Sequence, residues 1–256
     1  MAEFKSYLPG TPSWVDLSSV DLSGAKSFYR GLFGWDATQG GPEAGGYCMF
    51  QKEGKNVAGL GPVMHEGQYP SWMTYVTVDD ADATVARVVA AGGTVVVDPM
   101  EVLDAGRMAV FLDPTGAALA LWQPRAHTGA DLANEASTFT WNELQTRDTA
   151  AAVSFYRSVF GWGTHSRNGL MRYTEWKRGD HSVGGMMDMP AEVPPQIPAY
   201  WLVYFAVDDC DASVSRATEL GGAALLAPIE VEPGRLAVLS DPTGAVFAVI
   251  TMNTGA

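Results

Sequence analysis

Cysteine is scarce in this chain of 256 residues, and positive charge is outweighed by negative charge. The two cysteines, Cys48 and Cys210, are too few for a disulfide framework and are not equivalent in the repeat described below, so we expect buried free thiols. Lys and Arg number 16 against 29 Asp and Glu, and a formal net charge of −13 repels phosphate backbones and anionic lipid. We therefore expect neither a nucleic acid nor a membrane as a partner.

Long apolar runs and familiar cofactor motifs are also lacking. No window approaches the roughly 18 uncharged apolar residues of a membrane span, and no basic flank followed by an apolar run stands near the start, so the expected localisation is cytoplasmic. There is no GxGxxG dinucleotide motif and no GxSxG nucleophile motif. The four histidines have no counterparts in the repeat and favour surface loops; they are His65, His127, His165 and His181.

What the sequence does contain is an internal repeat. Three pairs of segments match in order: SFYR and FGW recur in 12–35 and 139–162, VDD and a final GG in 75–93 and 204–222, and DPTG in 106–121 and 234–249. Ordered self-similarity of this kind indicates a tandem duplication. We therefore predict module 1 over residues 8–124 and module 2 over 137–252, joined by a polar linker over 125–136, with each module long enough to bury a core.

The first half of each repeat predicts a strand followed by a helix. Residues 14–19 alternate between apolar and polar side chains, as strands do. Asp21 then supplies a helix N-cap, apolar residues follow at helical spacing, and Gly34 is suited to end the helix. The Trp residues of the two FGW motifs, Trp35 and Trp162, are expected to pack under the helix end.

The second half predicts a strand over 73–78, a helix, and further strands. Asp79 or Asp80 is expected to cap the helix and Gly92 to end it. Three valines fall on its expected buried face: Val85, Val88 and Val89. Residues 113–116, DPTG, have the residue order of a type I turn between antiparallel strands.

This order of motifs, present twice, resembles the glyoxalase, bleomycin-resistance and extradiol-dioxygenase superfamily, also called the vicinal oxygen chelate superfamily. The resemblance implies an α+β fold of two tandem glyoxalase-like modules, each made of two βαβββ units with curled mixed sheets around a cavity. Since the duplication already supplies four such units, we expect a monomer that is a pseudo-dimer of modules, with a homodimer as the alternative.

In metal-dependent members of that superfamily, ligands lie near the start of the first strand, before VDD, and in the final strand past DPxG. Carried onto this chain, these positions fall on Trp14, Met73 and Ala120 in module 1, and on Trp141, Leu202 and Ala248 in module 2. A hard or borderline divalent ion needs oxygen or imidazole donors. We therefore expect no metal and no other cofactor, which argues against glyoxalase, dioxygenase and epoxide-opening activities.

Strand alternation places the i+2 neighbours of these positions in the same cavity. The predicted ligand-binding residues are Trp14, Asp16, Met73, Tyr75 and Trp122 in module 1, and Trp141, Glu143 and Tyr204 in module 2. Indole faces stack on planar rings, and a partly desolvated carboxylate attracts an amine. The alternative is structural: the tryptophans fill a core, and Asp16 and Glu143 bond to backbone or to a Tyr hydroxyl.

Two further features are shared by the modules. Arg107 and Arg235 follow Gly at matched positions and are expected to cap a loop or pair with an acid. The segments 59–72 and 184–201 are long and rich in Pro, Gly or Met, which is typical of loops that cover a cavity.

The leading functional hypothesis is a metal-free binding protein for a planar aromatic natural product or antibiotic, and its more specific form is a ligand that carries an amine. The expected role is self-resistance, sequestration or biosynthetic support. An anthracycline-type ligand, planar with an amino sugar, has this chemistry. The alternative is a metal-independent isomerase, cyclase or accessory to oxidative tailoring, with Asp16 or Glu143 as base and Tyr75 or Tyr204 as donor. A third hypothesis is a protein that acts through its surface.

Overall fold

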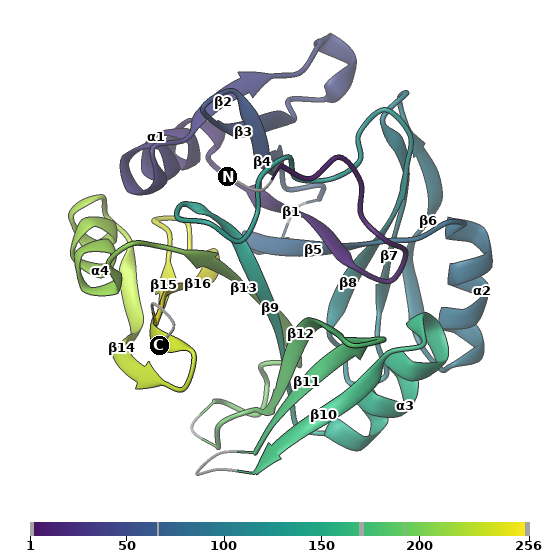
Figure 1. Cartoon of the computed structure of the whole chain (residues 1–256). Helices are drawn as coiled ribbons and strands as arrows, with labels where there is room; N and C mark the ends of the chain where they lie inside the picture. Colours follow the sequence, from purple (N-terminus) through teal and green to yellow (C-terminus); the bar gives the residue numbers. More distant parts are fainter. Residues whose placement is uncertain (1–2, 66, 169–171, 192, 254–256) are drawn as a thin grey trace.

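The computed structural model describes residues 3–65, 67–168, 172–191 and 193–253 (Figure 1). The first half contains strands β1 Pro12–Ser19, β2 Asp36–Gln39, β3 Cys48–Lys52, β4 Lys55–Pro62, β5 Ser71–Thr77, β6 Thr94–Val102, β7 Gly106–Leu112 and β8 Ala118–Pro124. The second contains β9 Thr138–Thr146, β10 Gly163–Asn168, β11 Arg172–Arg178, β12 His181–Asp188, β13 Tyr200–Ala206, β14 Ala223–Val231, β15 Gly234–Ser240 and β16 Val246–Met252. The helices are α1 Leu22–Phe33, α2 Ala81–Ala90, α3 Thr149–Phe160 and α4 Cys210–Glu219, with a short 3-10 turn η1 Pro42–Ala44.

Each half forms one open mixed sheet of eight strands. The strand orders are β2-β3-β4-β1-β5-β8-β7-β6 and β10-β11-β12-β9-β13-β16-β15-β14, so the two sheets have the same topology. In each sheet two strand-helix-strand units meet where their first strands pair antiparallel, β1 with β5 and β9 with β13. The predicted α+β fold of two tandem glyoxalase-like modules is confirmed. None of the helices in the described part of the chain is long and apolar enough to span a bilayer.

Local signals placed the helices correctly, with one exception. Asp21 accepts a hydrogen bond from the Gly24 amide at 2.9 Å as the N-cap of α1, and the end residue Gly34 has a φ of 75°. Asp80, rather than Asp79, caps α2. The expected position of Val89 on the buried face is wrong: its side chain is 57% exposed, because Ala81, Thr84 and Val88 form the face that packs on the sheet.

Replacing Gly161 by alanine should lower the free energy of unfolding by about 1 kcal/mol, because Gly161 ends α3 in the left-handed region that a Cβ disfavours. Its φ is 70°, and an added Cβ would meet nothing within 4 Å, so the loss is one of backbone conformation alone. Urea unfolding measures it, with Gly161→Asn as a milder control because Asn tolerates this region. An unchanged midpoint in the alanine variant would contradict the assignment.

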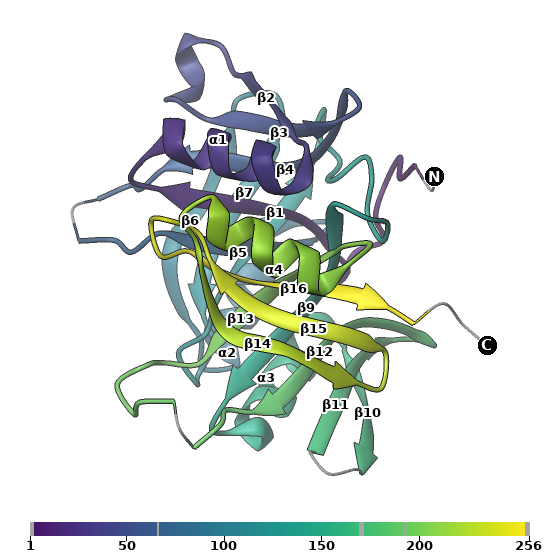
Figure 2. The ribbon, with the colours of Figure 1, turned by 90° about the vertical axis from the view of Figure 1, so that its left-hand side faces the viewer.

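The cores of the two modules are not separate. One apolar cluster joins α1 and strands of the first unit of module 1 with α4, β13, β15 and β16 of module 2, and a second joins α2, β7 and β8 with α3, β11 and β12. Helix α1 lies beside α4 and α2 beside α3 (Figures 1 and 2). The predicted linker contributes as well, since Leu132 and Ala133 are buried in the first cluster. The modules therefore interlock instead of packing as two finished domains.

Repeated aromatic residues hold the modules together by hydrogen bonds. The Trp201 indole donates to the Tyr156 hydroxyl at 2.8 Å, which donates to Asp113 of the other module at 2.8 Å. The same chain runs from Trp72 through Tyr29 to Asp241, at 3.0 and 3.3 Å. The FGW tryptophans also act across the modules, because the Trp35 indole bonds the Ser137 carbonyl and the Trp162 indole bonds the Gly10 carbonyl. Their predicted structural role is confirmed by these bonds and by full burial.

Candidate functional site

The sheet face opposite the helices carries a Trp, a Tyr pair and one carboxylate in module 1. Val15 and Leu17 of β1 point into the helix-side core, so Trp14 and Asp16 point to the other side. Pairing of β1 with β5 sets Trp14 beside Tyr75 and Asp16 beside Met73. We call this surface the helix-free face of module 1; its apolar cluster comprises Trp14, Tyr75, Ala120, Trp122 and Ala130, with Met49, Met73, Val102, Ala105, Met108 and Val110 around them.

Asp16 is held by two tyrosine hydroxyls on this face. Tyr75 donates to Asp16 Oδ2 at 2.9 Å and Tyr47 donates to the same oxygen at 3.2 Å. The Trp14 indole donates in turn to the Tyr47 hydroxyl at 3.1 Å. Among the described residues, Asp16 Oδ1 accepts no hydrogen bond, which leaves one carboxylate oxygen for another partner.

Module 2 repeats the arrangement with a longer acid. Tyr204 donates to Glu143 Oε1 at 2.9 Å and Gln145 donates to the same oxygen. The Trp141 indole donates to the Tyr173 hydroxyl at 2.8 Å. The helix-free face of module 2 has an apolar cluster of Leu202, Tyr204, Ala248 and Ile250, with Trp141, Tyr200, Leu236, Val238 and Val246 around them.

Glycine makes room for these tyrosines. Gly59 of β4 pairs with Asp16 and Gly185 of β12 pairs with Glu143. A Cβ on Gly59 would lie 1.8 Å from the Tyr47 hydroxyl, and one on Gly185 would lie 1.9 Å from that of Tyr173. Any larger residue would push the hydroxyl away from the carboxylate, so glycine is part of each site.

Burial dominates the electrostatics of both carboxylates. Desolvation raises the pKa of Asp16 from 3.8 to about 6, while the hydrogen bonds from Tyr75 and Tyr47 oppose the rise. Desolvation likewise raises the pKa of Glu143, against hydrogen bonds from Tyr204, Tyr173 and Gln145. Burial, and secondly the neighbouring carboxylate, raises the pKa of Tyr75 and Tyr47, so both stay neutral donors.

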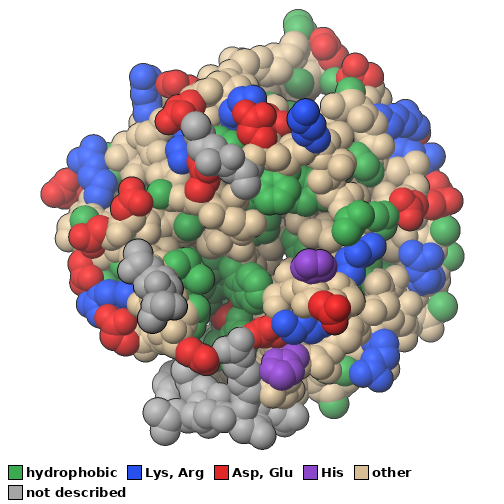
Figure 3. Space-filling view, in the orientation of Figure 1, with side chains coloured by type: hydrophobic (Ala, Val, Ile, Leu, Met, Phe, Trp, Pro, Cys, Tyr) green, Lys and Arg blue, Asp and Glu red, His purple; other side chains and the backbone are tan. Residues whose placement is uncertain are grey.

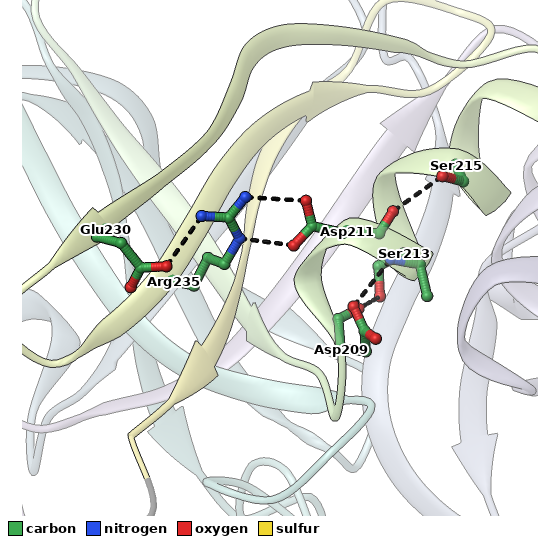
Figure 4. Close-up of polar contacts among 7 residues, drawn as sticks. Asp209, Asp211, Ser213, Ser215, Glu230 and Arg235 are labelled. Carbon is green, nitrogen blue, oxygen red and sulfur yellow. Dashed lines mark hydrogen bonds and ion pairs between the residues drawn. The ribbon is translucent and has the colours of Figure 1, made fainter.

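The described residues supply no cation to either carboxylate. The ion pairs that the structure contains lie elsewhere, and the matched arginines are engaged by other acids. Arg235 bonds Asp211 of α4 at 2.6 Å and Glu230 of β14 at 2.9 Å (Figure 4). Arg107 pairs with Asp82 at 2.9 Å in the same way. The expected pairing of these arginines with acids is confirmed, and they fix helices to strands.

The predicted site residues are therefore brought together, and two were missed. Trp14, Asp16, Met73, Tyr75 and Trp122 share one face, and Trp141, Glu143 and Tyr204 share the other. Tyr47 and Tyr173 escaped prediction because the repeat is weak around them. A signal existed in the matched spacing of Tyr47 to Phe50 and of Tyr173 to Trp176.

Other expectations need correction or refinement. The prediction of a surface loop position is wrong for His127, whose half-buried ring lies between Trp14 and Trp122. His65 is exposed in a loop as predicted, whereas His165 and His181 are exposed on strands β10 and β12. Both cysteines are buried free thiols, as expected.

The two long segments expected to cover the cavities are partly strand. Residues 59–62 belong to β4 and residues 184–188 to β12, which shortens the connections, and residues 66 and 192 lie outside the described part of the chain. The Arg147 guanidinium bonds three carbonyls of the second connection, those of Val193, Pro194 and Ile197. Two small cavities of about 200 and 190 Å³ lie beside Pro9 and Asp79, away from both carboxylates.

The donors on the helix-free faces do not fit a divalent metal ion. The carried-over ligand positions present indole, thioether and aliphatic side chains, and each module offers one central carboxylate that already accepts two hydrogen bonds. No group of three or more His, Cys, Asp and Glu side chains converges among the described residues. Hard cations require several oxygen or nitrogen donors around one point.

The fold and the duplicated sequence together define the family. Residues 11–121 match the Glyoxalase/Bleomycin resistance protein/Dioxygenase superfamily and residues 141–250 match the Glyoxalase-like domain, so the chain belongs to this superfamily. It is similar to "Putative glyoxylase CFP32" of Mycobacterium tuberculosis, with 44% identity over 259 residues and 98% of each chain covered. It is also similar to the anthracycline biosynthesis protein DnrV of Streptomyces peucetius, with 41% identity, 97% of this chain and 96% of the relative covered.

Solved structures show the same fold at low sequence identity. The Mn(II)-bound glyoxalase from Novosphingobium aromaticivorans superposes with a TM-score of 0.66 at 18% identity, covering 97% of this chain and 86% of that chain. The 2,2',3-trihydroxybiphenyl 1,2-dioxygenase from Sphingomonas wittichii gives 0.64 at 14% identity, covering 95% and 91%. At these identities the solved structures show the fold alone, so the chemistry of the site has to be argued from the residues described above.

Proposed function

We propose that this protein binds a planar aromatic small molecule that carries an amine, and that it does so without a metal ion. One observation carries the proposal: each module has a buried carboxylate on an apolar face that also bears a tryptophan. Among the described residues, neither carboxylate has a cationic partner. Such a carboxylate lowers stability when it is ionised unless an opposite charge meets it.

A ligand ammonium would supply the missing charge. The two tyrosine hydroxyls stabilise the ionised acid only in part, since the pKa of Asp16 stays near 6. An amine placed against the free carboxylate oxygen gains a charge-assisted hydrogen bond in a poorly solvated place, which is stronger than in water. The planar part of the ligand would lie on the indole and aliphatic side chains beside it.

The relatives support the ligand class. Two of them are named anthracycline biosynthesis proteins, and anthracyclines combine a planar ring system with an amino sugar. We therefore propose an anthracycline-like natural product as the ligand, with self-resistance, sequestration or support of biosynthesis as the role.

Daunorubicin should quench the tryptophan fluorescence of the wild-type protein in a saturable way. The protein should bind N-acetyldaunorubicin, the uncharged analogue, at least about tenfold more weakly. The double variant Asp16→Asn, Glu143→Gln should lose this preference, because neither acid can then carry charge. Affinity of the wild type for daunorubicin should fall as the pH is lowered, because acids whose pKa is raised by burial take up a proton and lose their charge; for Asp16 this occurs near pH 6. Equal affinity for the two compounds at all pH values would refute the proposal.

One observation favours a second function, that of a metal-independent enzyme. A carboxylate with a pKa near 6 that faces a tyrosine donor is suited to proton abstraction near neutral pH. The same double variant separates the two functions, since an enzyme would lose turnover of a bound compound while keeping most of its affinity for it.

A further inference from the structure

The two helix-free faces differ at their tryptophans, because the chain covers the face of module 1 with one of its own side chains. The His127 ring meets Trp14 edge-on, with ring centroids 4.4 Å apart and planes at 80°, and it meets Trp122 at 5.6 Å. The Trp122 indole also donates to the His127 carbonyl at 2.8 Å. As a result Trp14 is only 3% exposed.

His127 behaves as a neutral aromatic ring in this position. Burial lowers the pKa of its imidazole to about 4, so the ring carries no charge at neutral pH. Its Nε2 atom is buried and has no hydrogen-bond partner among the described residues. The imidazole therefore lies against both indoles, in the place where an aromatic ligand would otherwise contact them.

Among the described residues of module 2, no ring lies against Trp141 as His127 lies against Trp14, and residue 255, the counterpart of His127 in the repeat, is outside the described part of the chain. Trp141, the counterpart of Trp14, is partly exposed, and Ile250 stands in the place of Trp122. Leu226 and Ile229 of β14 pair with Val238 and Leu236 of this face, and they are 39% and 36% exposed. A hollow with hydrophobic walls is visible between the β14 side of the molecule and strands β10 to β12 (Figure 3).

The rim of module 1 does not differ in the same way. Met100 of β6 pairs with Met108 of the helix-free face and is 49% exposed, so this wall is as open as its counterpart in module 2. The two rims are therefore similarly exposed, whereas the surroundings of the indoles differ, because His127 lies there in module 1.

We propose that the helix-free face of module 2 is the ligand site of the resting protein, that Glu143 is the residue that receives the amine, and that His127 closes the face of module 1. One planar aromatic amine then binds per chain. This inference rests on the proposed function and specifies which of the two faces binds the ligand.

Calorimetric titration of the full chain with daunorubicin tests the assignment. We expect a stoichiometry of one and an affinity lowered by about tenfold or more in Glu143→Gln. His127→Ala should uncover module 1 and raise the stoichiometry to two, and adding Asp16→Asn to that variant should remove the second site.

Exposed rim residues give a matched pair of variants that should not disturb folding. Ile229→Lys places a positive charge at the rim of module 2 and should weaken daunorubicin binding by about tenfold, whereas Met100→Lys at the rim of module 1 should leave it unchanged. A wild-type stoichiometry of two, a larger loss in Asp16→Asn than in Glu143→Gln, or a single site in His127→Ala would each overturn the assignment. Absence of any daunorubicin binding would instead overturn the proposed function on which it rests.

Discussion

Replacing Asp113 by alanine is expected to lower the free energy of unfolding by about 3–5 kcal/mol, because one buried carboxylate serves both a turn and the module interface. Oδ1 accepts from the Thr115 amide at 2.7 Å, the Thr115 hydroxyl at 2.7 Å and the Ala117 amide at 3.0 Å. Oδ2 accepts from Tyr156 of the other module at 2.8 Å. Alanine would leave these donors in a buried region without an acceptor.

Urea unfolding of three variants separates the contributions. Tyr156→Phe removes the cross-module bond and the acceptor of the Trp201 indole but leaves the bonds within the turn, and it should lower stability by about 2–3 kcal/mol. Asp241→Ala is the matched control in module 2, and its effect should be somewhat smaller because Tyr29 lies 3.3 Å from Asp241. If Asp113→Ala changed stability no more than Tyr156→Phe does, the turn would not depend on the carboxylate as we infer.

Replacing Asp16 by asparagine is expected to have the opposite effect and stabilise the protein by about 2–3 kcal/mol at neutral pH. The folded-state pKa of Asp16 is about 6 against 3.8 in its ordinary environment, a difference that corresponds to about 3 kcal/mol. Since the folded pKa is raised, the folded state binds the extra proton between these values, and the wild type loses stability as the pH rises from about 4 to about 6. Asparagine resembles the protonated acid and avoids that loss.

The quantity to measure is the difference in unfolding free energy between variant and wild type as a function of pH. His127 acts in the opposite direction, because its lowered pKa of about 4 makes stability rise with pH over an overlapping range, and this contribution cancels in the difference. The difference should grow from near zero below about pH 4 to its full value above about pH 6. A difference that stays flat across this range would show that burial of Asp16 does not disfavour its ionisation.

The sequence predicts the fold well because the motifs that repeat are those that shape the backbone. Asp21, Gly34 and the DPTG turns act locally through caps and tight hydrogen bonds, so their effect can be read without tertiary structure. The positions of Trp14, Asp16 and Tyr75 follow equally directly, since strand alternation fixes the face to which each points.

Contacts between distant segments could not be predicted in this way. Tyr47 reaches Asp16 from the position just before β3, a strand whose place in the sheet depends on the whole fold, and only because position 59 is glycine. His127 belongs to a polar segment with the composition of an exposed linker, yet it ends between two tryptophans. Val89 shares a helical stripe with Val85 and Val88, but the face that packs on the sheet is centred on Ala81, Thr84 and Val88, and Val89 lies about 100° around the helix from that centre.

The interlocked cores carry a consequence for the way the chain folds. Val15 near one end and Val249 near the other belong to the same apolar cluster, so neither half can bury its apolar surface before the other has been synthesised. Folding should therefore be a single late event for the whole chain. The same arrangement concentrates stability on the helix side of both sheets, which leaves the opposite faces free to diverge in sequence. A duplicated chain can in this way keep one scaffold intact while one of its two faces is closed and the other is retained for a ligand.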